Sequence, residues 1–296
     1  MKKKPILLLT GACGSIGSSL VSKLAFSNLY EIITLGKNHP ANDVKVDLSF
    51  PDSHQVIRDI NPDYVIHLAG TRKLKESFID PVFDMKTNVL GTLNLMRGLS
   101  DRKEVTITFA TSGAIYGPVC TKPFTENSPL SCESPYAISK VTAECYVAQQ
   151  SLEFGHKWTS LAISNTYGPL KTHKTGVISS MLMALKENSP LEVFGQKVTR
   201  DFIHVDDVSD AFILSLNNPA GTRLNISSMQ ERSLIEVFLY LKQITNSDLE
   251  PTWQEPELGT TLRNCLDNSK ARQYLGWSPK REFLPALRAI WLSSTT

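Results

Sequence analysis

The chain has 296 residues, of which 41% are hydrophobic and 20% are charged. This length and composition allow a full hydrophobic core, in one large domain or in two unequal ones. The formal net charge of +2 gives no basis for a surface that binds nucleic acid or a membrane. We therefore expect neither of these two classes of partner.

The N-terminus superficially mimics a signal peptide, because lysines precede the apolar residues 6–9. Thr10 and Gly11 end that apolar run too early for such a peptide, and no segment approaches the length of a transmembrane helix. The five cysteines are irregularly spaced without a C-x-x-C motif, and the six histidines lack the spacing of metal ligands. These features predict a cytoplasmic protein with free thiols and no metal site.

The first predicted element is a buried parallel strand over residues 6–9, which a glycine-rich turn joins to a helix over residues 16–25. In that turn Gly11 permits the tight bend, Gly14 lets the backbone approach a pyrophosphate, and Gly17 lets the helix pack closely on the strand. The free N–H groups at the start of the helix favour phosphate. We therefore assign five residues of the turn to the binding of a dinucleotide: Gly11, Gly14, Ser15, Ile16 and Gly17.

Further strands are predicted over residues 31–35, 64–69 and 105–110, with helical patterns between them. This alternation indicates an α/β fold, a doubly wound parallel sheet of the Rossmann type, whose ligands bind at the carboxyl ends of the strands. The candidate cofactor contacts at these ends, beyond the glycine turn, are Lys37, Asp47, Leu48, Leu68, Ala69, Gly70 and Ile163.

A second chemical signal comes more than a hundred residues later. Tyr136 and Lys140 are four residues apart, so on a helix they share a face. A nearby ammonium favours the phenolate of a tyrosine and lowers its pKa from the usual value of about 10. Ser112 ends the preceding strand and is placed to hydrogen-bond the same reacting oxygen. An isolated pair with this spacing also fits an ordinary amphipathic helix, but after the glycine turn it predicts an acid/base group beside a nicotinamide.

The remainder of the chain predicts a second, smaller C-terminal substrate domain. We assign residues 1–165 and roughly 200–226 to the cofactor domain, and residues 166–199 and 227–296 to the smaller domain. In the smaller domain we expect a helix over residues 176–188, another that Gly276 ends, and a last amphipathic helix from about Phe283. The active site is expected in the cleft between the two domains.

These motifs resemble, over nearly the whole chain, the extended short-chain dehydrogenase/reductases of the nucleotide-sugar epimerase/dehydratase group. The resemblance rests on the glycine turn and on residues 65–70, 88–92, 112–117, 136–140, 165–169, 200–208 and 275–277. It implies catalytic roles for Ser112, Tyr136 and Lys140. Of these, Tyr136 and Lys140 are also expected to contact the cofactor, and Lys140 to hold the nicotinamide ribose. It further implies cofactor contacts for Arg72 and Asn88, and substrate contacts for Ser112, Asn165, Val177 and Arg200.

Two departures from the family pattern bear on the activity. Relatives that use NAD usually end the second strand with an acidic residue that binds the adenosine ribose, whereas this chain has Gly36 and Lys37. A cation in place of a carboxylate suits a 2′-phosphate and favours NADP over NAD, although Lys37 also fits a plain surface charge. Gly113 and Ala114 stand where related 4,6-dehydratases carry an acidic pair, so a dehydratase lacks its proton donor and acceptor here.

The diphosphate contact also departs from the pattern. Relatives often carry an arginine shortly before the region of Gly259, where this chain has Glu257 and Leu258. Arg263 is the candidate that substitutes for it as a substrate contact.

The expected activity is hydride transfer at C4 of a nucleotide-diphospho-sugar, first as an NADP-dependent reductase of a 4-keto or 4-keto-6-deoxy sugar. A 4-epimerase that retains NAD is the alternative. A non-catalytic, cofactor-sensing protein is a third possibility, which the tyrosine and lysine pair disfavours.

The predicted helices over residues 85–99 and 137–154 are apolar on more than one side. Such helices are either buried within one subunit or, as in the family, form the four-helix bundle of a dimer. Because an isologous helical interface is the commonest solution for such surfaces, we expect a homodimer.

Overall fold

The apolar run near the N-terminus forms β1 (Ile6–Thr10), in which Leu7, Leu8 and Leu9 are fully buried. A strand buried on both faces belongs in the interior of a parallel sheet that is covered by helices on both sides. The structure is a computed structural model that describes residues 3–37, 39–71, 74–118, 123–170, 176–256 and 261–295.

β1 lies in a seven-stranded sheet in which every pairing is parallel. The order of the strands is β10 (Arg223–Ile226), β6 (Lys157–Ile163), β5 (Thr106–Ser112), β4 (Tyr64–His67), β1, β2 (Glu31–Gly36) and β3 (Val44–Lys45). The chain winds outward from β1 in both directions, so the carboxyl ends of β1 and β4 form the switch point where ligands of such sheets bind.

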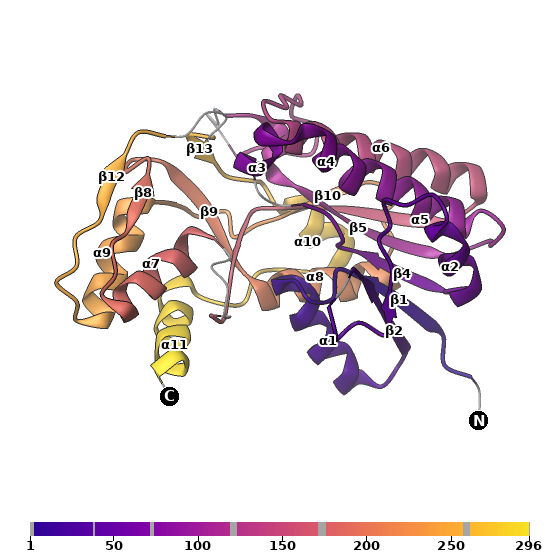
Figure 1. The fold of residues 1–296 in the computed structure, drawn as a ribbon, viewed down its shortest axis with the longest axis horizontal. Helices are drawn as coiled ribbons and strands as arrows, with labels where there is room; N and C mark the ends of the chain where they lie inside the picture. Colours follow the sequence, from indigo (N-terminus) through magenta and orange to yellow (C-terminus); the bar gives the residue numbers. More distant parts are fainter. Residues whose placement is uncertain are drawn as a thin grey trace.

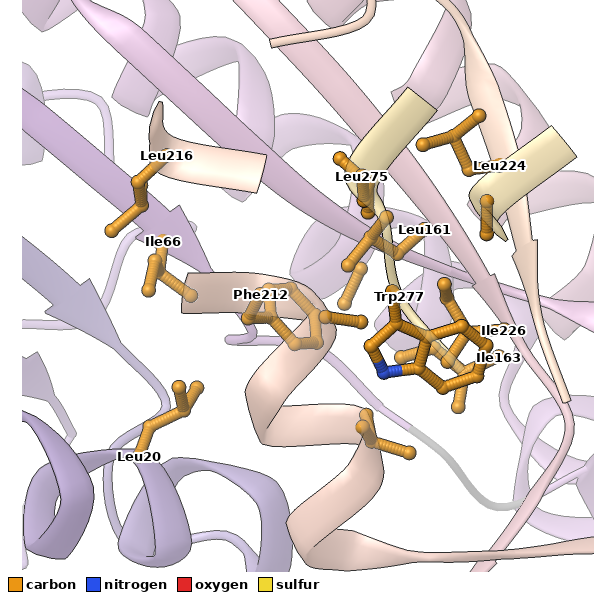
Figure 2. Packing of buried hydrophobic residues seen from close by; sticks show 14 of the residues in the cluster. Leu20, Ile66, Leu161, Ile163, Phe212, Leu216, Leu224, Ile226, Leu275 and Trp277 are labelled. Carbon is orange, nitrogen blue, oxygen red and sulfur yellow. The ribbon is translucent and has the colours of Figure 1, made fainter. Parts of the chain in front are cut away.

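Helices cover both faces of this sheet (Figure 1). One face is covered by α1 (Ser15–Ser27), α8 (Val205–Asn217) and α10 (Ser269–Leu275), and the other by α2 (Ser53–Ile60), α5 (Gly91–Leu99) and α6 (Pro135–Phe154). On the first face the ring of Phe212 lies in the middle of the hydrophobic cluster, with Leu20 and Trp277 nearby (Figure 2). The two layers fix the strand ends at which the site is built.

The rest of the chain forms a smaller unit at the carboxyl edge of the sheet. Its four-stranded sheet contains β9 (Thr199–His204), which pairs with β7 (Asn165–Tyr167), β11 (Glu231–Ser233) and β13 (Arg263–Asn264). Its other elements are β8 (Glu192–Phe194), β12 (Thr252–Gln254), α7 (Val177–Glu187), α9 (Leu234–Thr245) and α11 (Phe283–Thr295). Apolar side chains of α7, α9 and α11 share one core with those of β9.

Buried carboxylates fasten the smaller unit to the larger one. Asp207 at the start of α8 accepts hydrogen bonds from the backbone N–H groups of Lys280 (3.1 Å) and Arg281 (3.0 Å), and its carbonyl accepts one from the Trp277 indole (2.8 Å). Asp201 on β9 accepts bonds from the backbone N–H (2.9 Å) and the hydroxyl (2.7 Å) of Ser228, in the loop after β10. Each buried charge is thus surrounded by donors, as its burial requires.

The expected doubly wound parallel sheet is confirmed, and so are its strands near residues 6–9, 31–35, 64–69 and 105–110. The expected division into two domains stays a prediction. The segment 200–226, which the sequence assigned to the cofactor domain, is divided between the two sheets. Its strand β9 pairs in the smaller sheet, whereas α8, which follows β9 directly, packs against α1 on the large sheet.

The expected helix over residues 85–99 is present, but it begins earlier and contains a π-helical turn. The segment consists of the end of α4 (Pro81–Met85), the π-helical turn η1 (Lys86–Leu90) and α5. A π-turn rotates the following side chains relative to a regular helix and is frequent at functional sites. Here it accompanies a buried Asn88, whose backbone carbonyl accepts a hydrogen bond from the Thr92 hydroxyl (2.6 Å).

No helix in the described part of the chain is long and apolar enough to span a bilayer.

Candidate active site

The glycine turn packs so closely that side chains are excluded from it. A Cβ added to Gly17 would lie 2.3 Å from the carbonyl oxygen of Gly11, and one added to Gly11 would lie 2.8 Å from the backbone nitrogen of Ala69. Gly14 caps α1 without a side-chain hydrogen bond, so the first N–H groups of the helix face the cleft without a side-chain cap. This geometry fits a pyrophosphate.

A cleft of about 550 Å³ begins at this turn and runs along the carboxyl ends of the strands. A second hollow of about 250 Å³ continues it on the far side of Ser112 and Tyr136. The cleft brings together most of the residues that the sequence predicts for the site: Gly11, Gly14, Ser15, Ile16, Gly17, Leu68, Ala69, Gly70, Ser112, Tyr136, Lys140, Ile163, Asn165 and Val177. The second hollow adds Arg200.

Tyr136 and Lys140 lie on the first turns of α6, which Ser134 caps by accepting a hydrogen bond from the Ala137 N–H (3.1 Å). Ser112 ends β5, and its hydroxyl oxygen accepts a hydrogen bond from the Ala114 N–H (3.2 Å). The cap and the strand end together fix where the three polar groups meet in the cleft.

The Lys140 ammonium is buried, with 5% of the residue exposed, and it lies 4.5 Å from the centre of the Phe109 ring. Burial lowers the pKa of Lys140 to about 8, and the nearby carboxylates of Glu144 and Asp84 oppose this shift. No carboxylate lies within 4 Å of the ammonium among the residues that the structure describes. Lys140 itself lines the cleft.

His67 links the switch-point strands behind the cleft. Its Nδ1 lies 2.6 Å from the Thr10 hydroxyl, and its Nε2 lies 3.0 Å from the Thr92 hydroxyl. Because Thr92 donates its proton to a carbonyl, Nε2 is the protonated nitrogen and Nδ1 accepts from Thr10. Burial, and then the charge of Lys140, lower the pKa of His67 to about 3. The ring is thus a neutral structural group.

Arg200 supplies a positive charge at the far end of the site. Its guanidinium donates to the backbone carbonyls of Thr199 (2.8 Å) and Thr261, and burial lowers its pKa to about 10. No carboxylate pairs with it in the described ranges of the chain. A half-buried cation without a carboxylate partner suits an anionic ligand such as a diphosphate.

Three of the expected cofactor residues lie at the edge of the sheet, beyond the cleft lining. The Lys37 ammonium lies 2.9 Å from the Asp47 carboxylate and 5.2 Å from the centre of the Phe83 ring. Although partial burial acts to raise the pKa of Asp47, hydrogen bonds from Ser49 and Lys37 lower it below its ordinary value. Leu48 packs beside Gly91 of α5.

Two further expected contacts also lie apart from the cleft lining. Asn88 is buried behind it and would touch a Cβ on Gly70 at 2.6 Å. Arg263 is exposed and pairs with Glu231 at 2.5 Å, so its assignment as a substrate contact stays a prediction. Arg72 lies outside the described residues, as do Glu257 to Gly259.

A polar network that was not predicted from the sequence surrounds Asn88. Its Nδ2 donates to the hydroxyls of Thr71 (2.8 Å) and Ser139 (2.8 Å), and the Ser139 hydroxyl donates to Asp84 (2.5 Å). A signal was present: Asp84 precedes Asn88 by four residues, and Ser139 stands inside the tyrosine and lysine motif. The contact between α4, which carries Asp84, and α6, which carries Ser139, is however not predictable from the sequence.

The shifted pKa of His67 predicts a pH-dependent stability. The pKa of His67 is depressed in the folded state. Between pH 6.5 and about 3, His67 is therefore protonated in the unfolded chain but neutral in the folded protein. Stability is therefore lost as the pH falls through this range. In His67→Gln the decline in the free energy of unfolding should be shallower by up to about 1.4 kcal/mol per pH unit. Urea titrations at several pH values measure the slope. The exposed His39→Gln serves as the control, and equal slopes in all three proteins would contradict a neutral, buried His67.

The family model of the NAD dependent epimerase/dehydratase family matches residues 7–227. A UDP-glucose 4-epimerase from Mycolicibacterium smegmatis is 32% identical over 294 residues, covering 92% of this chain and 93% of the relative. A GDP-6-deoxy-D-mannose reductase from Pseudomonas aeruginosa is 31% identical over 297 residues, covering 96% of this chain and 95% of the relative.

Two solved structures share the fold of this protein over almost the whole chain. A UDP-glucose 4-epimerase with UDP-glucose from Thermotoga maritima has a TM-score of 0.91 at 29% identity, covering 98% of this chain and 99% of that one. RMD from Pseudomonas aeruginosa complexed with NADPH has a TM-score of 0.84 at 30% identity, covering 98% of this chain and 100% of that one. With the glycine turn, the paired Tyr136 and Lys140 and the matched length, the chain belongs to the NAD-dependent epimerase/dehydratase family of extended short-chain dehydrogenase/reductase enzymes.

Proposed function

We propose that this enzyme is an NADP-dependent reductase of a nucleotide-diphospho-4-keto sugar, with a 4-keto-6-deoxy sugar as the first candidate. The observation that carries the proposal is the end of β2, where Gly36 and Lys37 offer a cation and no carboxylate to the adenosine ribose. A reductase consumes its cofactor in each turnover, and cells commonly draw on NADPH for reductions.

The ion pair between Lys37 and Asp47 is compatible with the binding of NADP by Lys37. Both partners are partly exposed, at 47% for the Lys37 side chain and 24% for that of Asp47. Exposed pairs of this kind contribute about 0–1 kcal/mol, so a dianionic phosphate can compete with Asp47 for the ammonium. Asp47 then keeps its hydrogen bonds from the N–H (2.9 Å) and the hydroxyl (2.8 Å) of Ser49.

The chain's own residues supply the proton and hold the sugar. When bound, the nicotinamide dinucleotide supplies the hydride. Tyr136 donates the proton to the C4 oxygen, and the buried Lys140 ammonium favours the phenolate that remains. The Ser112 hydroxyl accepts from the Ala114 N–H, which leaves its own proton to orient the same sugar oxygen.

The substrate end of the cleft has the chemistry of a nucleotide diphosphate site. The Arg200 guanidinium lies in the hollow beyond Tyr136, where a diphosphate would compensate its charge. Asn165 and Val177 line the adjoining part of the cleft, with polar and apolar surface respectively. A substrate that spans both hollows therefore combines a sugar near Tyr136 with an anionic linker near Arg200.

The close packing at Gly113, next to Ser112, disfavours a dehydratase, which would eliminate water from the sugar. A Cβ added to Gly113 would lie 3.0 Å from a methyl group of Leu266, so an acidic side chain there would have to displace it. Elimination of water needs an acid and a base at such positions.

A 4-epimerase with retained NAD is the second candidate. Ser112, Tyr136 and Lys140 serve both reactions, because each uses the same proton transfer beside the nicotinamide. The similarity to UDP-glucose 4-epimerases favours this candidate, and the Gly36 and Lys37 pair opposes it.

The two candidates differ in cofactor consumption. For the reductase, addition of a nucleotide-linked 4-keto-6-deoxyhexose should lower the absorbance of NADPH in proportion to the product formed. Interconversion of two C4-epimeric nucleotide-hexoses without net loss of reduced cofactor would contradict the reductase and favour the epimerase. Chromatography of the sugar nucleotides, together with the absorbance, distinguishes the outcomes.

Replacement of Tyr136 by Phe should reduce kcat by about 10² or more, because one proton-transfer partner is removed. Dinucleotide affinity should stay within about threefold, since the ring is kept. Steady-state kinetics and fluorescence titration measure the two effects. Full activity in a correctly folded Tyr136→Phe protein, checked by circular dichroism, would overturn the assigned role.

Replacement of Lys37 by Ala should weaken NADPH about tenfold and leave NADH nearly unchanged, because only NADPH carries the 2′-phosphate. Lys45→Ala is the matched control, since Lys45 is an exposed lysine on the neighbouring strand β3. Titration of both dinucleotides against the three proteins measures the preference. A wild-type protein that prefers NADH would remove the main support for the reductase.

We also propose a homodimer, built on an apolar surface of α3 (Leu74–Ile79), α4 and α6. Its exposed side chains are Phe78, Ile79, Val82, Phe83, Met85, Ile138, Tyr146 and Leu152. Several neighbouring apolar side chains that face water indicate a partner surface. The residues of α5, which the sequence analysis also assigned to the interface, are mostly buried within the subunit.

A charge on this surface should dissociate the dimer. We expect Ile138→Arg to run as a monomer in size-exclusion chromatography with light scattering, because an unpaired charge opposes burial. Leu239→Arg, on the exposed side of α9, should keep the dimer. A monomeric wild-type protein at micromolar concentration would contradict the proposal.

A further inference from the structure

Behind the wall of the cleft lies a carboxylate that the proposed reaction does not use. Asp84 on α4 has 2% of its surface exposed. No ion pair reaches it within the residues that the structure describes. A buried charge without a direct ionic partner is costly unless hydrogen bonds and nearby charges compensate it, so its presence requires an explanation.

Among the residues that the structure describes, the polar side chains that contact this carboxylate are hydrogen-bond donors. The Ser139 hydroxyl donates to Oδ2 at 2.5 Å, the Asn88 side-chain amide approaches Oδ1 at 3.2 Å, and the Thr71 hydroxyl donates to Oδ1. A set of donors without an acceptor is the environment of an ionised carboxylate. Asp84 therefore joins three segments: the loop after β4, η1 and α6.

These three segments also surround the ammonium of Lys140. Ser139 is its neighbour on α6. A Cβ added to Gly70 would lie 2.6 Å from the Asn88 amide oxygen and 3.8 Å from the Lys140 nitrogen, so both groups flank the same glycine. The position of the ammonium thus depends on the elements that Asp84 holds together.

Two carboxylates oppose the effect of burial on Lys140, first Glu144 and then Asp84. His67 on β4 is neutral, Tyr136 and Glu144 lie on α6 with Lys140, and Arg223 on β10 pairs with Glu144 at 2.7 Å. Glu144 is thus already compensated by a cation. Of these two carboxylates, Asp84 is the one that has no salt bridge within the described ranges of the chain.

We infer that Asp84 is a positioning residue for Lys140, which holds Ser139 and Asn88 in place and supplies the negative charge that keeps the buried ammonium protonated. The inference rests on the proposed function, because it takes Lys140 to bind the nicotinamide ribose.

The test measures NADPH affinity as a function of pH, by fluorescence titration in a Tyr136→Phe background so that the phenol does not titrate. Affinity should fall as the pH rises through about 8, where Lys140 loses its proton. In Asp84→Asn the midpoint of this fall should move down by about half to one pH unit, because a neighbouring negative charge is removed.

Two control variants separate charge from structure. Asp80→Asn removes an exposed carboxylate that caps α4 through the Phe83 N–H (2.8 Å), and it should keep the midpoint. Ser139→Ala removes the hydrogen bond from α6 to Asp84 but leaves the charge of Asp84 in place. It should therefore weaken NADPH binding at every pH without moving the midpoint of the pH dependence. Asp84→Ser removes the charge and keeps a small polar group, and its midpoint should shift as in Asp84→Asn.

A folded Asp84→Asn or Asp84→Ser protein with the parental midpoint overturns the inference and leaves the proposed function intact. If neither the Asp84→Asn nor the Asp84→Ser protein folds, Asp84 serves folding alone, and the inference is overturned as well. If the parental protein binds neither NADPH nor NADH at any pH, the proposed function itself fails, and the inference falls with it.

Discussion

The burial of the Lys140 ammonium is the constraint around which the site is built. An ammonium that loses its water must be compensated by the protein, and the cost is several kcal/mol if it is not. Here the compensation comes from the face of Phe109 on β5 and from the carboxylates of Glu144 and Asp84. Each of these groups lies on a different element or turn, so the charge can be held only where the sheet, α4 and α6 are packed together. The reactive end of the cleft is therefore a property of the whole cofactor unit.

The neutral state of His67 follows first from the burial of its own ring and then from the charge of Lys140. A second cation beside Lys140 would add repulsion between buried charges, and the histidine instead joins Thr10 to Thr92 through its two ring nitrogens. This chain of hydrogen bonds ties β1 and β4 to the turn that carries Asn88. The glycine turn at the end of β1 and the lysine on α6 are thus fixed relative to one another, as a reaction between two bound groups requires.

The sequence was sufficient for features that depend on neighbouring residues, and less so for contacts between distant ones. The glycine turn, the strands and the pair Tyr136 and Lys140 follow from local spacing, and the cleft brings them together as expected. The π-turn at η1 was missed because its pattern is that of a regular helix, and the turn accompanies the burial of Asn88 among tertiary contacts. Likewise, the partner of Lys37 and the burial of Asp84 depend on packing between elements that the sequence does not specify.

In the proposed reaction, a hydride from the cofactor reaches C4 of the sugar while Tyr136 protonates the oxygen at that carbon. The most direct measurement follows deuterium from NADPH labelled at C4 of the nicotinamide, on either face, into a nucleotide-linked 4-keto-6-deoxyhexose. The account predicts that one labelled form delivers its deuterium to C4 of the sugar product, as NMR and mass spectrometry would show. A product that carries no deuterium with either form, or sugar epimers that keep their own hydrogen at C4, would contradict it.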